Sequence, residues 1–172
     1  MQRLYWDAIN IDSHKVFYTV NEQGLNFVSS PECGLSQVLN FYAQSFEYVH
    51  DHEVTDAYRK SFKRYLKGKT GEFVVDRDSF VNGTPQEEEV WQRIAAIPYG
   101  KTQSVAVLAA EAKVSQQVVL QALQASPVWL VLPLHRVTGR GTKQLNFRTN
   151  QAMQDYLLQI EQKPKAEFKE LL

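Results

Sequence analysis

The chain has 172 residues, of which 44% are hydrophobic and 22% are charged, a composition typical of a folded globular protein rather than a disordered one. Its 19 basic and 19 acidic residues cancel, so no global field draws it to nucleic acid or to an anionic membrane, and any affinity for DNA must come from a local patch. The first residues lack the apolar core of a signal peptide, and no window approaches the roughly 18 apolar residues that would span a bilayer.

Cysteine occurs once, at Cys33, so no intramolecular disulfide can form, which favours a reducing, cytoplasmic location. His14, His50 and His52 could join Cys33 as metal ligands, but their spacing matches no recurrent ligand pattern. We therefore predict no metal site and no cofactor, and we expect no association with a membrane.

The first half of the chain predicts a small α+β domain over residues 1–82. Three runs rich in β-branched and aromatic residues, separated by polar segments, predict an antiparallel meander. These runs are residues 4–11, 15–20 and 25–29. Apolar residues at helical spacing predict a helix over 54–66, and residues 72–78 could return as one more strand.

A change of composition near residue 83 begins a second, mostly helical domain over residues 83–172. Thr84, Pro85 and Glu87 form a capping box with proline at the first helical position, which predicts a helix start. Four apolar residues should line the buried face of this helix. They are Val90, Trp91, Ile94 and Ile97.

Two short helices, at about 104–113 and 116–125, should follow with a brief connection between them. This pattern suggests a helix-turn-helix, although a plain helical hairpin produces it as well. Residues 128–133 are predicted to be strand-like or extended and buried. A last helix, at about 149–162, should bury Ala152, Met153, Tyr156, Leu157 and Ile160.

Several short motifs follow one another in a fixed order between residues 83 and 161. They are GTP and VW within 83–91, IPYGKTQS at 97–104, Pro127, PLHRVTG at 133–139 and LLQIE at 157–161. With these motifs the segment resembles the C-terminal domain of the O6-alkylguanine-DNA alkyltransferases. The predicted elements of the first half are of the same kind as those of the smaller domain of that family. The resemblance implies a ribonuclease-H-like N-terminal domain followed by a winged helix-turn-helix-like alkyltransferase domain.

The resemblance also implies a chemistry that this chain lacks one group to perform. The family flips the damaged base out of the duplex, because its target oxygen cannot be reached inside the stack. A cysteine thiolate, kept reactive by a histidine and a glutamate, then takes the alkyl group. His135 and Glu161 match those two partners, whereas Leu134, an inert hydrocarbon, stands at the acceptor position.

Further departures from the family fall on residues that the resemblance assigns to DNA. Gln117 stands where an arginine enters the space of the flipped base, and Leu120 stands where a glycine allows close approach to the backbone. Val105 replaces a tyrosine that acts on a phosphate. Ser126 replaces an asparagine, and Phe147 replaces a tyrosine. Arg136 completes the set of residues predicted to bind DNA; alternatively, Arg136 anchors the turn.

The segment 101–148 carries a local excess of positive charge that could contact phosphate. Its charged residues are Lys101, Lys113, Arg136, Arg140, Lys143 and Arg148, against the single acid Glu111. The helix expected at 116–125 holds no cation, but its glutamines could form hydrogen bonds with base edges.

We therefore predict a monomeric, non-catalytic homologue that binds double-stranded DNA or alkylated guanine without transferring the alkyl group. The alternative is a protein-interaction module that kept the fold but no longer binds DNA. An exposed apolar stripe through Val119, Leu120 and Leu123 would favour this alternative. An active methyltransferase remains a third possibility if Leu134 replaces a native cysteine.

Overall fold

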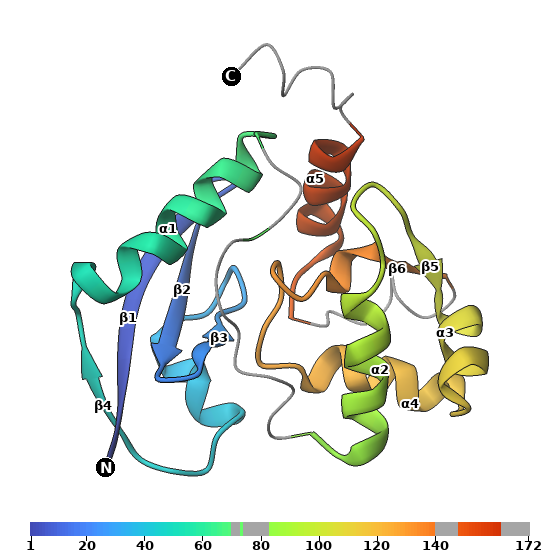
Figure 1. The fold of residues 1–172 in the computed structure, drawn as a ribbon, viewed down its shortest axis with the longest axis horizontal. Helices are drawn as coiled ribbons and strands as arrows, with labels where there is room; N and C mark the ends of the chain where they lie inside the picture. Colours follow the sequence, from blue (N-terminus) through green and yellow to red (C-terminus); the bar gives the residue numbers. More distant parts are fainter. Residues whose placement is uncertain (70–72, 74–82, 140–147, 163–172) are drawn as a thin grey trace.

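Four strands form the N-terminal sheet of the computed structural model, which describes residues 1–69, 73, 83–139 and 148–162 (Figure 1). The strands are β1 (Gln2–Ile11), β2 (His14–Asn21), β3 (Gly24–Val28) and β4 (Phe46–Val49). They lie in the order β3-β2-β1-β4, with β4 parallel to β1 and the other pairs antiparallel. The predicted meander is confirmed, whereas β4 was not predicted because four residues carry too little pattern.

The β1–β2 hairpin has a two-residue turn at Asp12 and Ser13, both with positive φ (49° and 68°). Such a turn matches the right-handed twist of the flanking strands and sets their register. The register pairs Ile11 with His14 and Ile9 with Val16. Alternate side chains of β1 therefore face opposite sides of the sheet.

Both faces of the sheet are covered. Helix α1 (His52–Leu66) begins at the N-cap Asp51, whose side chain accepts a hydrogen bond from Glu53 N, and its buried Phe62 and Tyr65 lie in the same core cluster as Ile9. On the other face, the 3-10 helix η1 (Leu35–Asn40) contributes to a smaller apolar cluster. That cluster consists of Leu4, Phe27, Val38, Tyr42 and Phe46.

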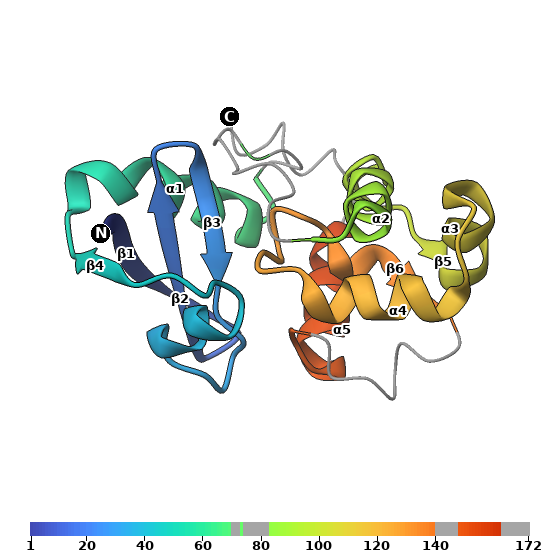
Figure 2. The ribbon, with the colours of Figure 1, turned by 90° about the horizontal axis from the view of Figure 1, so that it is seen from below.

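The C-terminal half is built from α2 (Pro85–Ala95), α3 (Val105–Ala112), α4 (Gln116–Ala125) and α5 (Gln151–Glu161). The capping box at Thr84 and Glu87 is confirmed, and so is the buried face of α2. Trp91 Nε1 donates to Ala122 O at 2.8 Å, which fixes α2 against α4. Figure 2 shows the two halves side by side.

Helices α3 and α4 follow each other with a short connection, as both the predicted helix-turn-helix and a helical hairpin require. Lys113 ends α3 in the left-handed conformation (φ 57°), and Ser115 caps α4 by accepting from Val118 N. A short parallel pair, β5 (Gln103–Ser104) and β6 (Val137–Thr138), lies beside these helices. The predicted fold class, an α+β domain followed by a mostly helical domain, is confirmed.

Two local predictions are wrong. Residues 128–133 are buried almost throughout but form no strand, because the backbone bends at 130–132 and Leu130 has a positive φ of 77°. The segment reaches the sheet edge through Val28 N, which donates to Pro127 O at 3.0 Å, and through Trp129 Nε1, which donates to Ser29 O at 3.0 Å. Ala152 is exposed, and Gln154 is buried instead because its amide bonds two backbone carbonyls.

The predicted strand at 72–78 lies outside the described residues except for Phe73, which is in no strand. The predicted domain boundary between residues 82 and 83 lies at the edge of the same undescribed segment and stays a prediction. Among the described helices, none is long and apolar enough to cross a membrane.

One apolar cluster draws on both halves of the chain, and the buried Arg148 bridges them. Its guanidinium donates to Ser126 O at 2.7 Å and to Val28 O, and it lies over the ring of Phe41 at 4.4 Å from the centroid. A cation in this position satisfies carbonyls that would otherwise be buried without a donor.

We predict that Arg148→Met, which keeps most of the side-chain volume but has no hydrogen-bond donor, lowers the free energy of unfolding by about 3 kcal/mol. The loss is expected because the buried carbonyl oxygens would have no donor. Urea denaturation followed by tryptophan fluorescence measures the loss. Arg93→Met is the matched control, since Arg93 makes only a partly exposed pair with Glu89 and should change stability by less than about 0.5 kcal/mol. Equal effects of the two substitutions would contradict the bridging role.

Candidate functional site

The acceptor position lies in a tight turn between two buried segments. Leu134, His135 and Arg136 form the 3-10 helix η2 (Leu134–Arg136), and all three are buried. Helix α5 holds this turn in place, because Gln154 Nε2 donates to the carbonyls of His135 (3.1 Å) and Val137 (3.0 Å). The backbone of the turn is therefore set by a side chain four residues into the last described helix.

The carboxylate of Glu161 is the centre of the site and is buried at the C-terminal end of α5. It accepts five hydrogen bonds from three parts of the chain. The donors are Arg136 Nε (2.9 Å), Arg136 Nη2 (3.1 Å), Gly100 N (3.0 Å), His135 Nε2 (2.6 Å) and the Tyr65 hydroxyl. Arg136 Nη1 also donates to Ile97 O at 2.7 Å. Every acceptor position of the carboxylate is thus occupied.

These contacts decide the protonation of the site. Burial by itself raises the pKa of Glu161, but the hydrogen bonds from His135 and Arg136 outweigh it and lower the pKa to about 2. Burial lowers the pKa of His135 in spite of its bond to Glu161, so the imidazole is neutral at pH 7. Because an ionised carboxylate only accepts, His135 Nε2 carries the proton and Nδ1 carries a lone pair.

His135 Nδ1 is buried and has no hydrogen-bond partner among the described residues. A free lone pair of this kind is what a general base presents to a thiol or a water. The neighbouring Leu134 is a hydrocarbon with 3% exposure, packed into the main apolar cluster. Cys33 is exposed in the segment between β3 and η1. It lies neither in the turn that carries Leu134 nor in the hydrogen-bond network around Glu161. Among the described residues, the turn places a neutral imidazole and the carboxylate that orients it beside a hydrocarbon side chain.

Tyr65 joins this network from the other half of the molecule, and the sequence did not single it out. It lies near the end of α1, and its hydroxyl contacts His135 Nε2 at 3.2 Å as well as Glu161. Burial, followed by the charge of Glu161, raises its pKa, so the phenol stays protonated and donates. Its helical spacing indicated a core residue, and only the packing of the two halves reveals its polar partner.

Three of the five described residues that were predicted to contact DNA lie inside the molecule. Val105 and Ser126 are 1% exposed, and the Ser126 hydroxyl bonds Val128 O at 2.7 Å. Arg136 is held by Glu161, which favours the anchoring role over contact with DNA. Leu120 is partly buried against the core, Gln117 is exposed on α4, and Phe147 lies outside the described residues.

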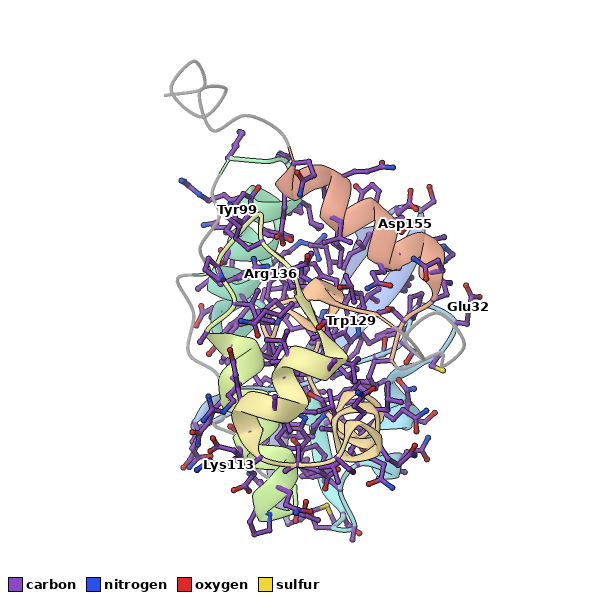
Figure 3. The ribbon with its side chains drawn as sticks, turned by 90° about the vertical axis from the view of Figure 1, so that its right-hand side faces the viewer. Glu32, Tyr99, Lys113, Trp129, Arg136 and Asp155 are labelled. Carbon is purple, nitrogen blue, oxygen red and sulfur yellow. The ribbon has the colours of Figure 1, made fainter. Side chains whose placement is uncertain are left out.

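The local positive charge is smaller at the surface than the sequence indicated. Arg136 and Arg148 are both buried and bonded internally. Lys101 and Lys113 are exposed, and Figure 3 shows Lys113 at the periphery, at the end of α3. Arg140 and Lys143 lie outside the described residues. Two of the six cations are therefore unavailable to phosphate.

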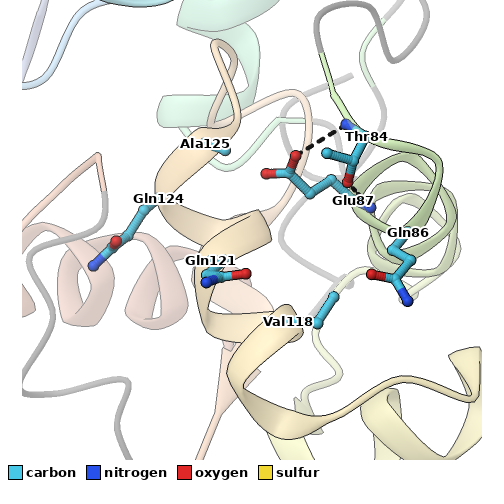
Figure 4. A pocket seen from close by; sticks show the side chains of 7 residues that line it. All are labelled: Thr84, Gln86, Glu87, Val118, Gln121, Gln124 and Ala125. Atoms are coloured by element: carbon cyan, nitrogen blue, oxygen red, sulfur yellow. Dashed lines mark hydrogen bonds between the residues drawn. The ribbon is translucent and has the colours of Figure 1, made fainter.

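A surface pocket of about 440 Å³ lies between the start of α2 and the side of α4 (Figure 4). Its lining residues are Thr84, Gln86, Glu87, Val118, Gln121, Gln124 and Ala125. Two glutamines of α4 therefore face a pocket that contains the carboxylate of Glu87. A carboxylate at this point disfavours contact with a phosphate.

A sequence model described as "6-O-methylguanine DNA methyltransferase, DNA binding domain" matches residues 85–163. The inducible methylated-DNA--protein-cysteine methyltransferase of Bacillus subtilis is 27% identical over 170 residues, 96% of this chain and 94% of that protein. The DNA base-flipping protein of Thermus thermophilus is 27% identical over 103 residues, 60% of this chain and 70% of that one.

Solved structures of O6-methylguanine methyltransferases share the fold of this chain. The crystal structure of Mycobacterium tuberculosis O6-methylguanine methyltransferase covers 92% of both chains with a TM-score of 0.71 at 20% identity. The structure of the Mycobacterium tuberculosis protein in complex with DNA gives a TM-score of 0.74 at 20% identity and covers 91% of this chain and 92% of that one. The likeness therefore spans both halves of the chain.

We predict that Glu161→Gln lowers the free energy of unfolding at pH 7 by about 3 to 5 kcal/mol, because Arg136 would remain buried without its counterion. The depressed pKa of Glu161 stabilises the native state above the ordinary carboxyl pKa of 4.5, and this stabilisation is lost as the pH falls toward about 2. Urea denaturation at several pH values should show the difference between the two proteins shrinking across that window. A difference that is constant with pH would contradict the assignment.

Proposed function

We propose that the chain binds DNA, with preference for alkylated guanine, and does not accept the alkyl group; the match of residues 85–163 to the model of the 6-O-methylguanine DNA methyltransferase DNA-binding domain supports this proposal. The relative from Bacillus subtilis is named as a methylated-DNA--protein-cysteine methyltransferase. The relative from Thermus thermophilus is named for flipping bases rather than for methyl transfer, which supports recognition as a separable activity.

The observation that carries the proposal is the buried hydrocarbon at position 134. Alkyl transfer requires a nucleophile with an available electron pair at the end of the turn, and the Leu134 side chain has none. The rest of the turn is retained with its hydrogen bonds complete apart from His135 Nδ1. A site that keeps its shape but lacks its nucleophile can hold a base without modifying it.

DNA recognition would rely on polar rather than cationic side chains. Gln116 and Gln117 are exposed at the start of α4, where amides can pair with base edges. Among the described residues of 101–148, Lys101 and Lys113 are the exposed cations. Two phosphate contacts correspond to a slope of about −2 in the logarithm of the binding constant against that of the salt concentration.

The alternative of a protein-interaction module loses its predicted support. It required an exposed apolar stripe along α4, but Val119 and Leu123 are fully buried and Leu120 packs against the core. The exposed face of α4 is made of glutamines. No specific observation on this helix favours an apolar partner.

We predict that the chain binds labelled duplexes containing O6-methylguanine more tightly than undamaged duplexes. We also predict that Gln117→Arg tightens binding to the damaged duplex by about tenfold, because a guanidinium there can fill the space of the flipped base and bond phosphate. Fluorescence anisotropy at two salt concentrations measures both. Gln159→Arg, on the exposed side of α5, is the charge-matched control. Equal tightening by both arginines would indicate a charge effect only, and equal binding to both duplexes would contradict lesion recognition.

We predict that incubation with methylated DNA leaves no alkyl adduct on the wild-type chain, as measured by intact-mass spectrometry. Leu134→Cys should also fail to repair stoichiometrically, because Val105, Gln117 and Ser126 replace further groups that the family chemistry uses. Stoichiometric transfer to the Leu134→Cys protein would show instead that position 134 alone blocks the reaction, as expected if leucine replaced a native cysteine.

A further inference from the structure

Three side chains that are distant in the sequence converge at the N-terminal end of α1. Asp7 comes from the middle of β1, His50 from the connection after β4, and His52 is the first residue of α1. His50 Nε2 lies 3.6 Å from Asp7 Oδ1, and His52 Nδ1 lies 3.5 Å from Asp7 Oδ2. One ligand atom from each residue lies within 4.8 Å of the other two.

We propose that Asp7, His50 and His52 bind a divalent transition-metal ion, with Zn²⁺ as the favoured member of that class. Zinc binds imidazole nitrogen and carboxylate oxygen at about 2.0 to 2.2 Å in tetrahedral geometry, which places ligand atoms about 3.4 Å apart. The separations of 3.6 Å from Oδ1 to His50 and 3.5 Å from Oδ2 to His52 are close to that edge and longer than a good N–H···O bond of about 2.9 Å. Because they run to different oxygens, one ion held by both histidines would use the two oxygens of Asp7 together or one of them after a small rotation of the side chain. Three protein ligands would leave one coordination position for water.

The ligands are already oriented by their neighbours. Ala8 N donates to Asp7 Oδ1 at 2.8 Å, and Thr55 Oγ1 donates to Oδ2 at 3.1 Å, so the buried carboxylate is held in one rotamer. The ring of His50 stacks on Trp6 with centroids 4.1 Å apart and an interplanar angle of 18°. Outer contacts of this kind fix the direction in which a metal ligand points.

Two features oppose a cation here and set the expected strength. Arg59 Nη1 lies 3.6 Å from Asp7 Oδ1, and its guanidinium also donates to Ala8 O. The start of α1 adds the positive end of the helix dipole. The affinity should therefore be moderate, and Arg59→Met should tighten metal binding because it removes a like charge. Bound metal would tie β1 to the start of α1 and raise the melting temperature.

The test uses the full-length protein after treatment with a chelator, titrated with ZnCl₂ by calorimetry and with Co²⁺ by visible absorption. We expect one equivalent to bind, with a rise in melting temperature. His52→Ala should weaken binding by at least about tenfold, since losing a ligand costs no less than losing an outer contact. His14→Ala is the matched control, because His14 lies on β2 beside Glu32, at 3.2 Å.

Specific loss with His52→Ala, together with retained binding in His14→Ala and Cys33→Ser, supports the site. A wild-type chain that takes up neither ion overturns the proposal, and so does a His52→Ala chain that binds as tightly as the wild type. His52 is well exposed, with 73% of its side chain accessible, so its removal does not threaten folding. Far-ultraviolet circular dichroism of each variant checks that the fold is retained.

Discussion

A buried carboxylate that must be fully hydrogen-bonded organises this molecule. Glu161 is desolvated, and an ionised group in that position is tolerated only when donors surround it. Its donors come from α1, from the connection at Gly100 and from the turn at His135 and Arg136. One group therefore joins the two halves of the chain and determines the shape of the turn that carries position 134.

This dependence explains how the site can keep its architecture without its nucleophile. His135 and Arg136 contribute to folding through Glu161, so their retention does not require catalysis. Leu134 packs into the apolar cluster and completes the same turn from the other side. The folded turn accommodates a hydrocarbon at position 134, because the hydrogen-bond network does not include the side chain at that position.

The distribution of charge follows the same logic. Arg136 and Arg148 neutralise or satisfy buried oxygens, so they are not available to an external polyanion. The surface of α4 is left with amides, which can recognise bases by hydrogen bonds but contribute little long-range attraction. The cluster of Asp7, His50 and His52 lies at the beginning of α1, and Tyr65 near its end reaches Glu161. The same helix thus borders both sites proposed here.

Periodicity, the capping box at Thr84 and Glu87, and ordered motifs were sufficient to predict the strand meander, the four C-terminal α-helices of the described residues and the resemblance to the alkyltransferases, because these signals are local or colinear. The sequence could not identify the residues whose role depends on partners far away in the chain. Tyr65 read as a core aromatic, and Arg136 could be either a DNA contact or an anchor. Asp7 and the two histidines did not form a recognisable ligand pattern, since strand pairing and helix packing bring them together only in three dimensions. Burial and partner choice are properties of the folded chain, and the tertiary structure decided them.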